Sequence, residues 1–199
     1  MMLSEQAPVP QAVLPVVQFK DHLRLGSGFA DDGQQDALAE SYLRAAMAAI
    51  EGRIGKALVQ RTFYLGLPRW RDRDEQALPL APVQAVASVT LVDGTGAETV
   101  LEATRWRLVK DMQRPRLRAV GRLFPEVPED GTVEIVFDAG FGPGWSDVPA
   151  DLRQAVFLLA AQYYELRHEP GPGEGAMPFG VMALIERWRT VRVLGGGAA

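Results

Sequence analysis

The chain has 199 residues, 47% of them hydrophobic and 23% charged, which is the composition of a globular protein with one core or a core carrying a small insert. Its net charge of -4 argues against a broad basic surface for nucleic acid, and zero cysteines exclude disulfides, thiolate metal ligands and cysteine nucleophiles. No basic segment followed by an apolar run opens the sequence, and no apolar run approaches about 18 residues, so we expect neither a signal peptide nor a membrane span.

The first third of the chain is predicted to be helical after an extended start. Residues 1–15 carry three prolines and little periodicity, which predicts an extended arm. Residues 16–58 are expected to form the amino-terminal helices. A short helix should cover 17–25, and a long one should begin near Asp32, whose spacing to Gln35 resembles a capping box. The long helix has an apolar stripe formed by Leu43, Met47, Ile50, Ile54 and Leu58.

The middle of the chain, residues 59–140, changes to the period of extended structure. Turn residues separate short apolar runs there, and Asp93-Gly94 is a hairpin signal. The predicted strands are 61–65, 83–92, 99–101, 106–109, 117–120 and 132–137. In the second of these, one face should carry Val83, Ala85, Ala87, Val89 and Leu91. Regular short strands with turns between them predict a small antiparallel sandwich or barrel.

The last third, residues 141–190, is predicted to return to helices, with a flexible tail at 191–199. The central helix should cover 149–168, and the last should open at Pro178 after a hinge at 170–175. The stripe of the central helix consists of Leu152, Val156, Leu159, Tyr163 and Leu166, widened by Phe157, Ala160 and Tyr164. We therefore expect an α+β fold in which amino- and carboxy-terminal helices form one bundle and the β segment is an antiparallel insert.

Two segments are candidates for chemistry. The glycine-rich run Gly140 to Gly144 lies between a strand and a helix, where phosphate loops occur, but its spacing is not GxGxxG and no Lys-Ser or Lys-Thr follows. Glu165 and His168 have the spacing of carboxylate-bridged metal helices, yet the chain has only one other histidine, His22. The sequence therefore favours a plain connector and a solvated helix end, with no catalytic residues, no metal and no cofactor.

Two basic clusters beside tryptophans are candidates for contacts with other molecules. Arg69, Trp70 and Arg71 should lie in a loop, where Asp72 and Asp74 offset the positive charge. The second cluster comprises Arg187, Trp188, Arg189 and Arg192, followed by Val193 and Leu194. Its position at a helix end would stabilise the helix, while its β-branched run would suit strand addition to another protein. Both interpretations stay open.

Three separated stretches carry a resemblance to the head–tail connector proteins (adaptor, or head-completion, proteins) of long-tailed bacteriophages and of gene transfer agents. The order and spacing of the stretches, rather than any one motif, make the resemblance. They are Ala45-Ala46, Ile50-Glu51, Gly55 and Leu58 leading into Gln60-Arg61-Thr62; Leu78-Pro79-Leu80-Ala81-Pro82-Val83-Gln84 with Val86, Val89 and Asp93-Gly94; and Phe137-Asp138-Ala139-Gly140-Phe141-Gly142 with Val148-Pro149-Ala150-Asp151-Leu152-Arg153-Gln154-Ala155 and Tyr164-Glu165.

The resemblance implies a structural subunit of the virion neck, assembled in the bacterial cytoplasm, with no enzymatic activity. Copies would form a ring, twelvefold in this family, beneath the portal protein, extending the DNA channel and giving the next neck or tail protein a platform. DNA would pass without sequence-specific binding. The expected ring contacts are Leu43, Met47, Ile50, Phe157 and Tyr164, and the expected portal-docking tail is Trp188, Arg189, Arg192, Val193 and Leu194.

Other functions stay open at this point. One is a small-molecule or nucleotide-binding module that uses the Gly140 to Gly144 loop, and another is a different neck protein such as a stopper or tail terminator. The long predicted helices argue against a stopper or a tail terminator, because these proteins are usually dominated by β-structure.

Overall fold

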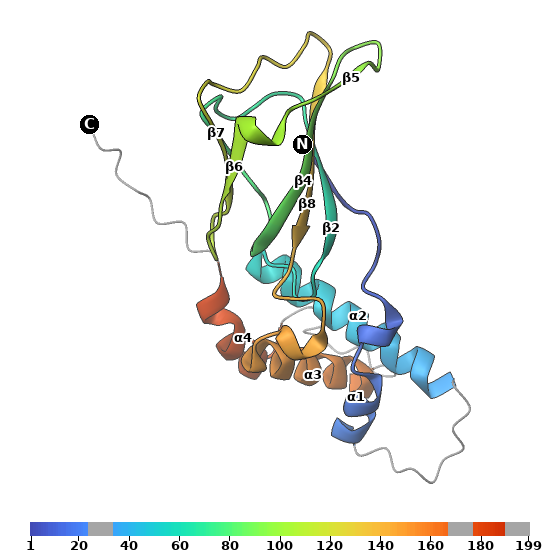
Figure 1. The fold of residues 1–199 in the computed structure, drawn as a ribbon. Helices are drawn as coiled ribbons and strands as arrows, with labels where there is room; N and C mark the ends of the chain where they lie inside the picture. Colours follow the sequence, from blue (N-terminus) through green and yellow to red (C-terminus); the bar gives the residue numbers. More distant parts are fainter. Residues whose placement is uncertain (24–33, 167–176, 190–199) are drawn as a thin grey trace.

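The computed structural model describes residues 1–23, 34–166 and 177–189. These residues form four α-helices and two antiparallel sheets, one of five strands and one of three, so the expected mixed α+β class is confirmed. The helices gather at one end of the molecule and the sheets at the other (Figure 1). Among the described helices, none has the length and apolar character that a membrane crossing requires.

The helical end is built on a pair of long helices. These are α2 (Gln34–Ile54) and α3 (Ala150–Glu165), which pack against each other. The short helices α1 (Val16–His22) and α4 (Phe179–Ile185) lie at opposite ends of this pair, which is a looser arrangement than the predicted bundle (Figure 1). All four contribute to one apolar core, whose fully buried members include Phe19, Leu43, Ile50, Leu152, Val156 and Ile185.

Helix α2 ends four residues earlier than its apolar stripe predicts. Gly55 follows the last helical residue with φ of 67°, and its N–H donates to the Glu51 carbonyl at 2.8 Å. A left-handed glycine at this position is a common helix terminator because other residues meet a steric penalty there. Leu58 is still buried, but it belongs to an extended segment that leads into the first long strand.

The other end is a sandwich of the two sheets. The larger sheet has the order β1-β2-β8-β4-β5 and the smaller has the order β3-β7-β6, with every neighbouring pair antiparallel. Their bounds are β1 Met2–Glu5, β2 Arg61–Leu67, β3 Glu75–Ala77, β4 Val83–Val92, β5 Glu98–Val100, β6 Trp106–Val109, β7 Arg116–Ala119 and β8 Thr132–Ala139. Within the predicted arm, residues 2–5 form the edge strand β1, whereas residues 11–13 form a short 3-10 helix. The larger sheet therefore includes a segment outside residues 59–140, which the predicted β insert did not contain.

The core of the sandwich comes from alternate residues of β2 and β8. Phe63 pairs with Phe137 across these strands, and their rings stack with centroids 5.8 Å apart. Alternation of this kind puts every second side chain on the face that the smaller sheet covers. The far end is filled by Trp70 stacked on Phe124, with centroids 4.3 Å apart.

The predicted face of β4 is wrong at its centre. Ala85 and Ala87 are exposed, whereas Val83, Val89 and Leu91 are buried. The register against β8 shifts twice, between Val83 and Ala85 and between Val86 and Ser88. Each bulge adds a residue to one strand only, so strict alternation of faces is lost across it.

A guanidinium joins the helical end to the sandwich. Arg61, the first residue of β2, donates from Nη2 to Glu51 Oε2 at 2.6 Å and from Nη1 to Glu51 Oε1 at 3.0 Å, so it holds the α2 carboxylate with both nitrogens. Its Nε donates to Glu5 Oε2 of β1 at 2.7 Å. The Arg61 side chain is only 11% exposed and that of Glu51 13%. Bidentate, charge-assisted bonds in such a site fix geometry as well as adding stability.

A second tie is the buried amine of Lys56, just after α2. Its side chain is fully buried, and Nζ donates to Gln113 Oε1 at 2.8 Å, in the connection between β6 and β7. Burial lowers the pKa of the Lys56 amine, because the charged form loses hydration, and the nearby Asp111 carboxylate partly opposes this effect.

The third tie is the backbone of Gly140, where β8 turns toward α3. This residue has φ of 137°, and a Cβ built there would lie 2.3 Å from both the N and the Cα of Gln60. Gln60 N donates to Gly142 O at 2.8 Å, and Phe141 N donates to Leu58 O at 3.1 Å. Two backbone segments therefore touch directly at the boundary between the two ends, and only glycine leaves room for this approach.

Glu51→Gln should destabilise the protein by about 2–4 kcal/mol, because it removes one charge from a nearly buried pair. Denaturant unfolding followed by circular dichroism measures this loss. Glu40→Gln is the matched control on the same helix: its pair with Arg44 at 2.8 Å is an ordinary i,i+4 contact, for which we expect about 0.5 kcal/mol or less. Equal losses in the two variants would contradict the role given to Arg61.

Gly140→Ala should cost about 3 kcal/mol or more, since the added methyl meets backbone atoms that cannot move aside and the φ is unfavourable for alanine. Thermal unfolding of the variant and of the wild type measures this loss of stability. Gly52→Ala on α2 is the control, because a Cβ there has nothing within 4 Å. That variant should gain about 0.5–1 kcal/mol from helix propensity. A Gly140→Ala protein as stable as the wild type would show that the close approach is unimportant.

Candidate functional site

The glycine-rich loop is a structural connector in which the N–H groups of Gly140, Phe141 and Gly144 are bonded to the chain itself. Gly140 N donates to Pro82 O at 2.9 Å, and Gly144 N donates to Asp147 Oδ2 at 2.8 Å. Phe141 N is also bonded within the chain, to Leu58 O. A phosphate loop presents such amides to its ligand. The geometry therefore favours the plain connector over the nucleotide-binding alternative.

The metal and catalytic candidates are not brought together. Glu165 ends α3 on the surface, and His168 lies outside the described residues. His22, on α1, contacts the Phe157 ring with centroids 5.6 Å apart. Within residues 1–23, 34–166 and 177–189, no three histidine, aspartate or glutamate side chains form a group that could hold a metal ion.

The predicted loop contact at Arg69, Trp70 and Arg71 needs correction at its centre. Trp70 is 7% exposed, and its Nε1 donates to Pro125 O at 2.8 Å. The indole thus belongs to the sandwich core, because its stacking on Phe124 closes one end of the two sheets. Arg69 and Arg71 are exposed on either side and stay candidates for contacts. The sequence suggested an exposed aromatic because basic and acidic residues surround it.

The start of the predicted docking tail is anchored on its own subunit. Trp188 Nε1 donates to Asp151 Oδ2 at 2.7 Å, and the indole meets Phe141 edge to face at 5.3 Å. The Arg187 guanidinium also contacts Asp151, at 2.8 Å, and lies over the indole ring. Arg189 pairs with Glu186. Arg192, Val193 and Leu194 fall outside the described residues.

Three of the five predicted ring contacts have an internal role. Leu43, Met47 and Ile50 are at most 4% exposed and lie in the core between α2 and the neighbouring helices. The apolar width of α2 is therefore used within the subunit, because α1 and α3 cover it. Phe157 and Tyr164 are half-buried, and Tyr164 meets Tyr42 edge to face at 6.0 Å. These two stay candidates for contacts between copies.

The outer face of the larger sheet is polar. Tyr64 Oη donates to Glu134 Oε1 and Thr62 Oγ1 donates to Asp138 Oδ1, both at 2.7 Å. Burial, aided by the Glu134 carboxylate, raises the pKa of Tyr64 to about 12, so its hydroxyl stays protonated and keeps donating. Two carboxylates make this face unsuited to binding nucleic-acid phosphate.

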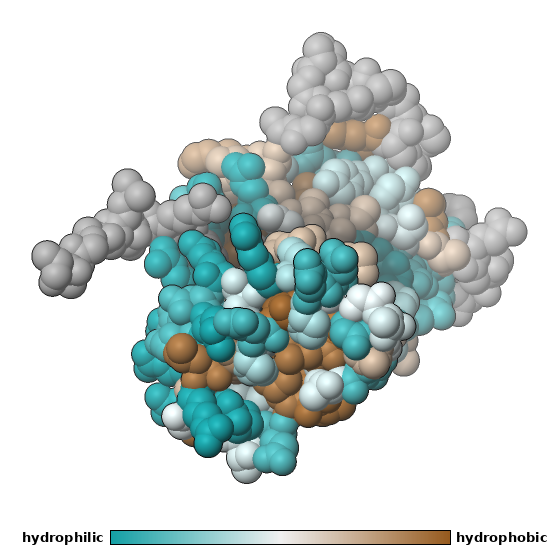
Figure 2. All heavy atoms as spheres, turned by 90° about the horizontal axis from the view of Figure 1, so that it is seen from above, coloured by the Kyte–Doolittle hydropathy of each residue, from teal (hydrophilic) through white to brown (hydrophobic). Residues whose placement is uncertain are grey.

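Exposed apolar residues mark two places that the sequence patterns did not single out. At the far end of the sandwich, Figure 2 shows an apolar patch within hydrophilic surroundings; exposed apolar side chains of β5 and of the connection from β7 to β8 are Val100, Val120 and Leu123. At the helical end, Phe179 opens α4 and is 86% exposed. The buried face of α4 is formed by Val181 and Ile185, and Phe179 lies outside it.

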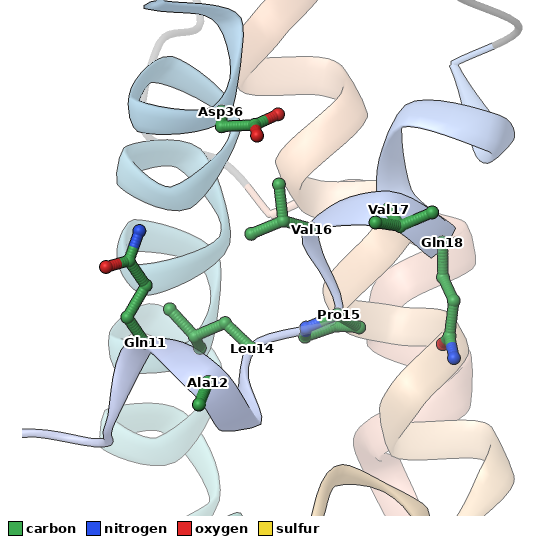
Figure 3. Close-up of a pocket in the computed structure, with 8 residues that line it drawn as sticks. All are labelled: Gln11, Ala12, Leu14, Pro15, Val16, Val17, Gln18 and Asp36. Carbon is green, nitrogen blue, oxygen red and sulfur yellow. The ribbon is translucent and has the colours of Figure 1, made fainter. Parts of the chain in front are cut away.

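A pocket of about 340 Å³ lies between α2 and the segment that joins η1 (Gln11–Val13) to α1 (Figure 3). Leu14 and Val16 point toward α2 there, and Asp36 projects from α2 beside them. The Asp36 carboxylate is paired with the Lys20 amine at 2.7 Å. The residues that line the pocket are Gln11, Ala12, Leu14, Pro15, Val16, Val17, Gln18 and Asp36.

Comparison with known proteins gives matches among solved structures, whereas no protein-family model and no curated protein sequence matches the chain. The chain is 63% identical, with a TM-score of 0.89, to a chain in the neck of an empty GTA particle computed with C6 symmetry. It is 62% identical, TM-score 0.86, to one in the virion of a native gene transfer agent (GTA) particle, and 58% identical, TM-score 0.84, to one in the neck of a native GTA particle computed with C12 symmetry.

Each match covers 98% of this chain and 99% of the other, so the likeness includes both the helical end and the sandwich. The resemblance seen in the sequence was to a broader group, the head–tail connectors of phages and gene transfer agents. An identity near 60% over the whole length, together with the same fold, assigns the chain to the gene transfer agents. The chain belongs to the neck proteins of gene transfer agent particles, which are structural proteins of the virion.

Proposed function

We propose that this protein is the adaptor subunit of the particle neck: copies form a twelvefold ring below the portal protein, extend the DNA channel and give the next neck or tail protein its platform. The observation that carries the proposal is the full-length match to chains in GTA necks. A ring of twelve copies obeys both the C12 and the C6 symmetry of those necks, whereas a ring of six obeys only the second.

The surfaces of the subunit support a role in assembly. The described residues offer no metal cluster, and the N–H groups of Gly140, Phe141 and Gly144 in the glycine-rich loop donate to acceptors within the chain. Exposed apolar residues lie instead at both ends, around Val100 and Leu123 on the sandwich and at Phe179 on the helical end. Isolated surface apolar residues are ordinary, but a structural subunit with contacts at several levels needs such places.

Charge suits passage of DNA. The net charge of -4 avoids the basic field that would retain a polyanion, and the outer face of the larger sheet carries the carboxylates of Glu134 and Asp138. We propose that the ring lets DNA through without sequence-specific binding.

We also propose that the end of the chain docks on the portal. Trp188, held by Asp151 and Phe141, fixes the point from which the last residues leave the helical end. Arg189, Arg192, Val193 and Leu194 would then form the docking segment. The β-branched run suits strand addition, in which main-chain hydrogen bonds give affinity.

Loss of this protein from a producing cell should leave heads and tails that do not join, because the ring would supply the surface between them. Electron microscopy of purified particles would count joined and unjoined structures, and expression of the wild-type chain in the same cells should restore joining. Normal numbers of tailed particles without the protein would overturn the adaptor role.

Deleting residues 190–199 should abolish attachment to the portal without altering the fold, because Trp188 and its contacts are kept. Attachment is measured by co-purification with portal-containing heads, and folding by thermal unfolding. Substituting the exposed Thr104 by alanine on the sandwich is the matched control, and it should attach as the wild type does. Unchanged attachment of the truncated chain would refute docking by this segment.

A further inference from the structure

Helix α4, at one end of the helical layer, begins with an exposed aromatic side chain. Phe179 is 86% exposed, while Val181 and Ile185 of the same helix are 1% exposed and anchor α4 to the core. The whole segment from Met177 to Ile185 contains no charged residue. Depletion of charge around an exposed aromatic is typical of the centre of a protein–protein contact.

The other end of the layer carries a matching depression. The pocket beside α1 measures about 340 Å³, and most of its lining comes from Gln11 to Gln18, a second segment without charge. The carboxylate at its rim, Asp36, is paired with Lys20. The pocket is open to solvent, so a phenyl side chain of another molecule can enter it and contact the apolar side chains of Leu14 and Val16.

The positions of these two features determine what they can do. Helix α4 lies at one end of the α2–α3 pair and α1 at the other, so Phe179 cannot reach the pocket of its own subunit (Figure 1). It can reach the pocket of a second copy. A contact between different patches on identical subunits is heterologous, and it closes into a ring when the rotation between copies is right.

We infer that Phe179 of one copy inserts into the pocket formed by Gln11–Gln18 and Asp36 of the next copy. This contact rests on the proposed ring and adds its subunit-to-subunit geometry. It replaces the buried residues of α2 as the apolar contact between copies, and it gives the ring a direction, because each subunit offers one projection and one pocket.

The absence of cysteine allows a direct test in assembled particles. Val17 is 71% exposed at the pocket, so Val17→Cys combined with Phe179→Cys should give, on mild oxidation, a ladder of disulfide-linked multimers. A mixture of chains carrying one substitution each should stop at dimers, because each chain then has a single reactive end. Phe179→Cys with Thr104→Cys on the sandwich is the matched control and should give no ladder.

A second measurement identifies the occupant of the pocket. A benzophenone amino acid at position 179 should attach, on illumination, to residues 11–18 of another copy, as shown by mass spectrometry of cross-linked peptides. Attachment to the portal or to a different neck protein would overturn the inference. So would particles that contain the double-cysteine chain but give no more multimers than the control pair.

The side chain's contribution can be measured with Phe179→Asp, which should fold normally because the site is exposed. Its occupancy in necks should fall about tenfold or more relative to the wild type, as expected for loss of one buried aromatic contact. Wild-type chain missing from particles would instead count against the proposed adaptor function. Sedimentation of the purified wild-type and Phe179→Asp proteins then tests the contact. Loss of self-association in Phe179→Asp supports the contact, and equal self-association of the two proteins overturns it.

Discussion

The contact of Arg61 with Glu51 and Glu5 is the interaction on which the rest of the structure depends. One guanidinium holds the end of α2, the start of β2 and the edge strand β1; Glu51 lies only 10 residues before Arg61, whereas Glu5 lies 56 residues before it. Burial lowers the pKa of the Arg61 guanidinium, but the hydrogen bonds and attraction of the Glu51 and Glu5 carboxylates outweigh this effect, so the pKa is raised above its ordinary value. Charged groups with so little access to water accept few alternative geometries, because a misplaced partner would leave a charge without solvation.

This constraint explains how two separate apolar cores form a single body. One core lies among the helices and the other between the sheets. Between them lie Arg61, the buried amine of Lys56 and the close backbone approach at Gly140. These ties are polar or steric and therefore directional, unlike hydrophobic burial. The proposed adaptor role, with a different partner at each end, calls for such a rigid joint, because a flexible one would not fix the position of one contact relative to the other.

The same joint explains why a glycine-rich segment mimics a ligand loop. Gly140 to Gly144 has the composition of a phosphate-binding turn, and it lies between a strand and a helix as such turns do. Here the glycines admit backbone rather than phosphate: the Gln60 main chain occupies the space beside Gly140, and Asp147 occupies the space beside Gly142. Composition is the same in both cases, and the neighbouring segment decides the role.

Local patterns in the sequence determined the α+β class, the helices of the last third and most of the strands, because periodicity and turn residues act over a few neighbours. The predicted stripe of α3 is buried at Leu152, Val156 and Leu159, but Tyr163 is half-buried and Leu166 is 44% exposed. Only the tertiary structure decided which apolar faces are covered. Leu43, Met47 and Ile50 are enclosed by other helices, Trp70 is stacked inside the sandwich, two bulges turn Ala85 and Ala87 outward, and Phe179 stays exposed. Burial depends on segments distant in the chain, so spacing alone could not separate an internal face from one free for another copy.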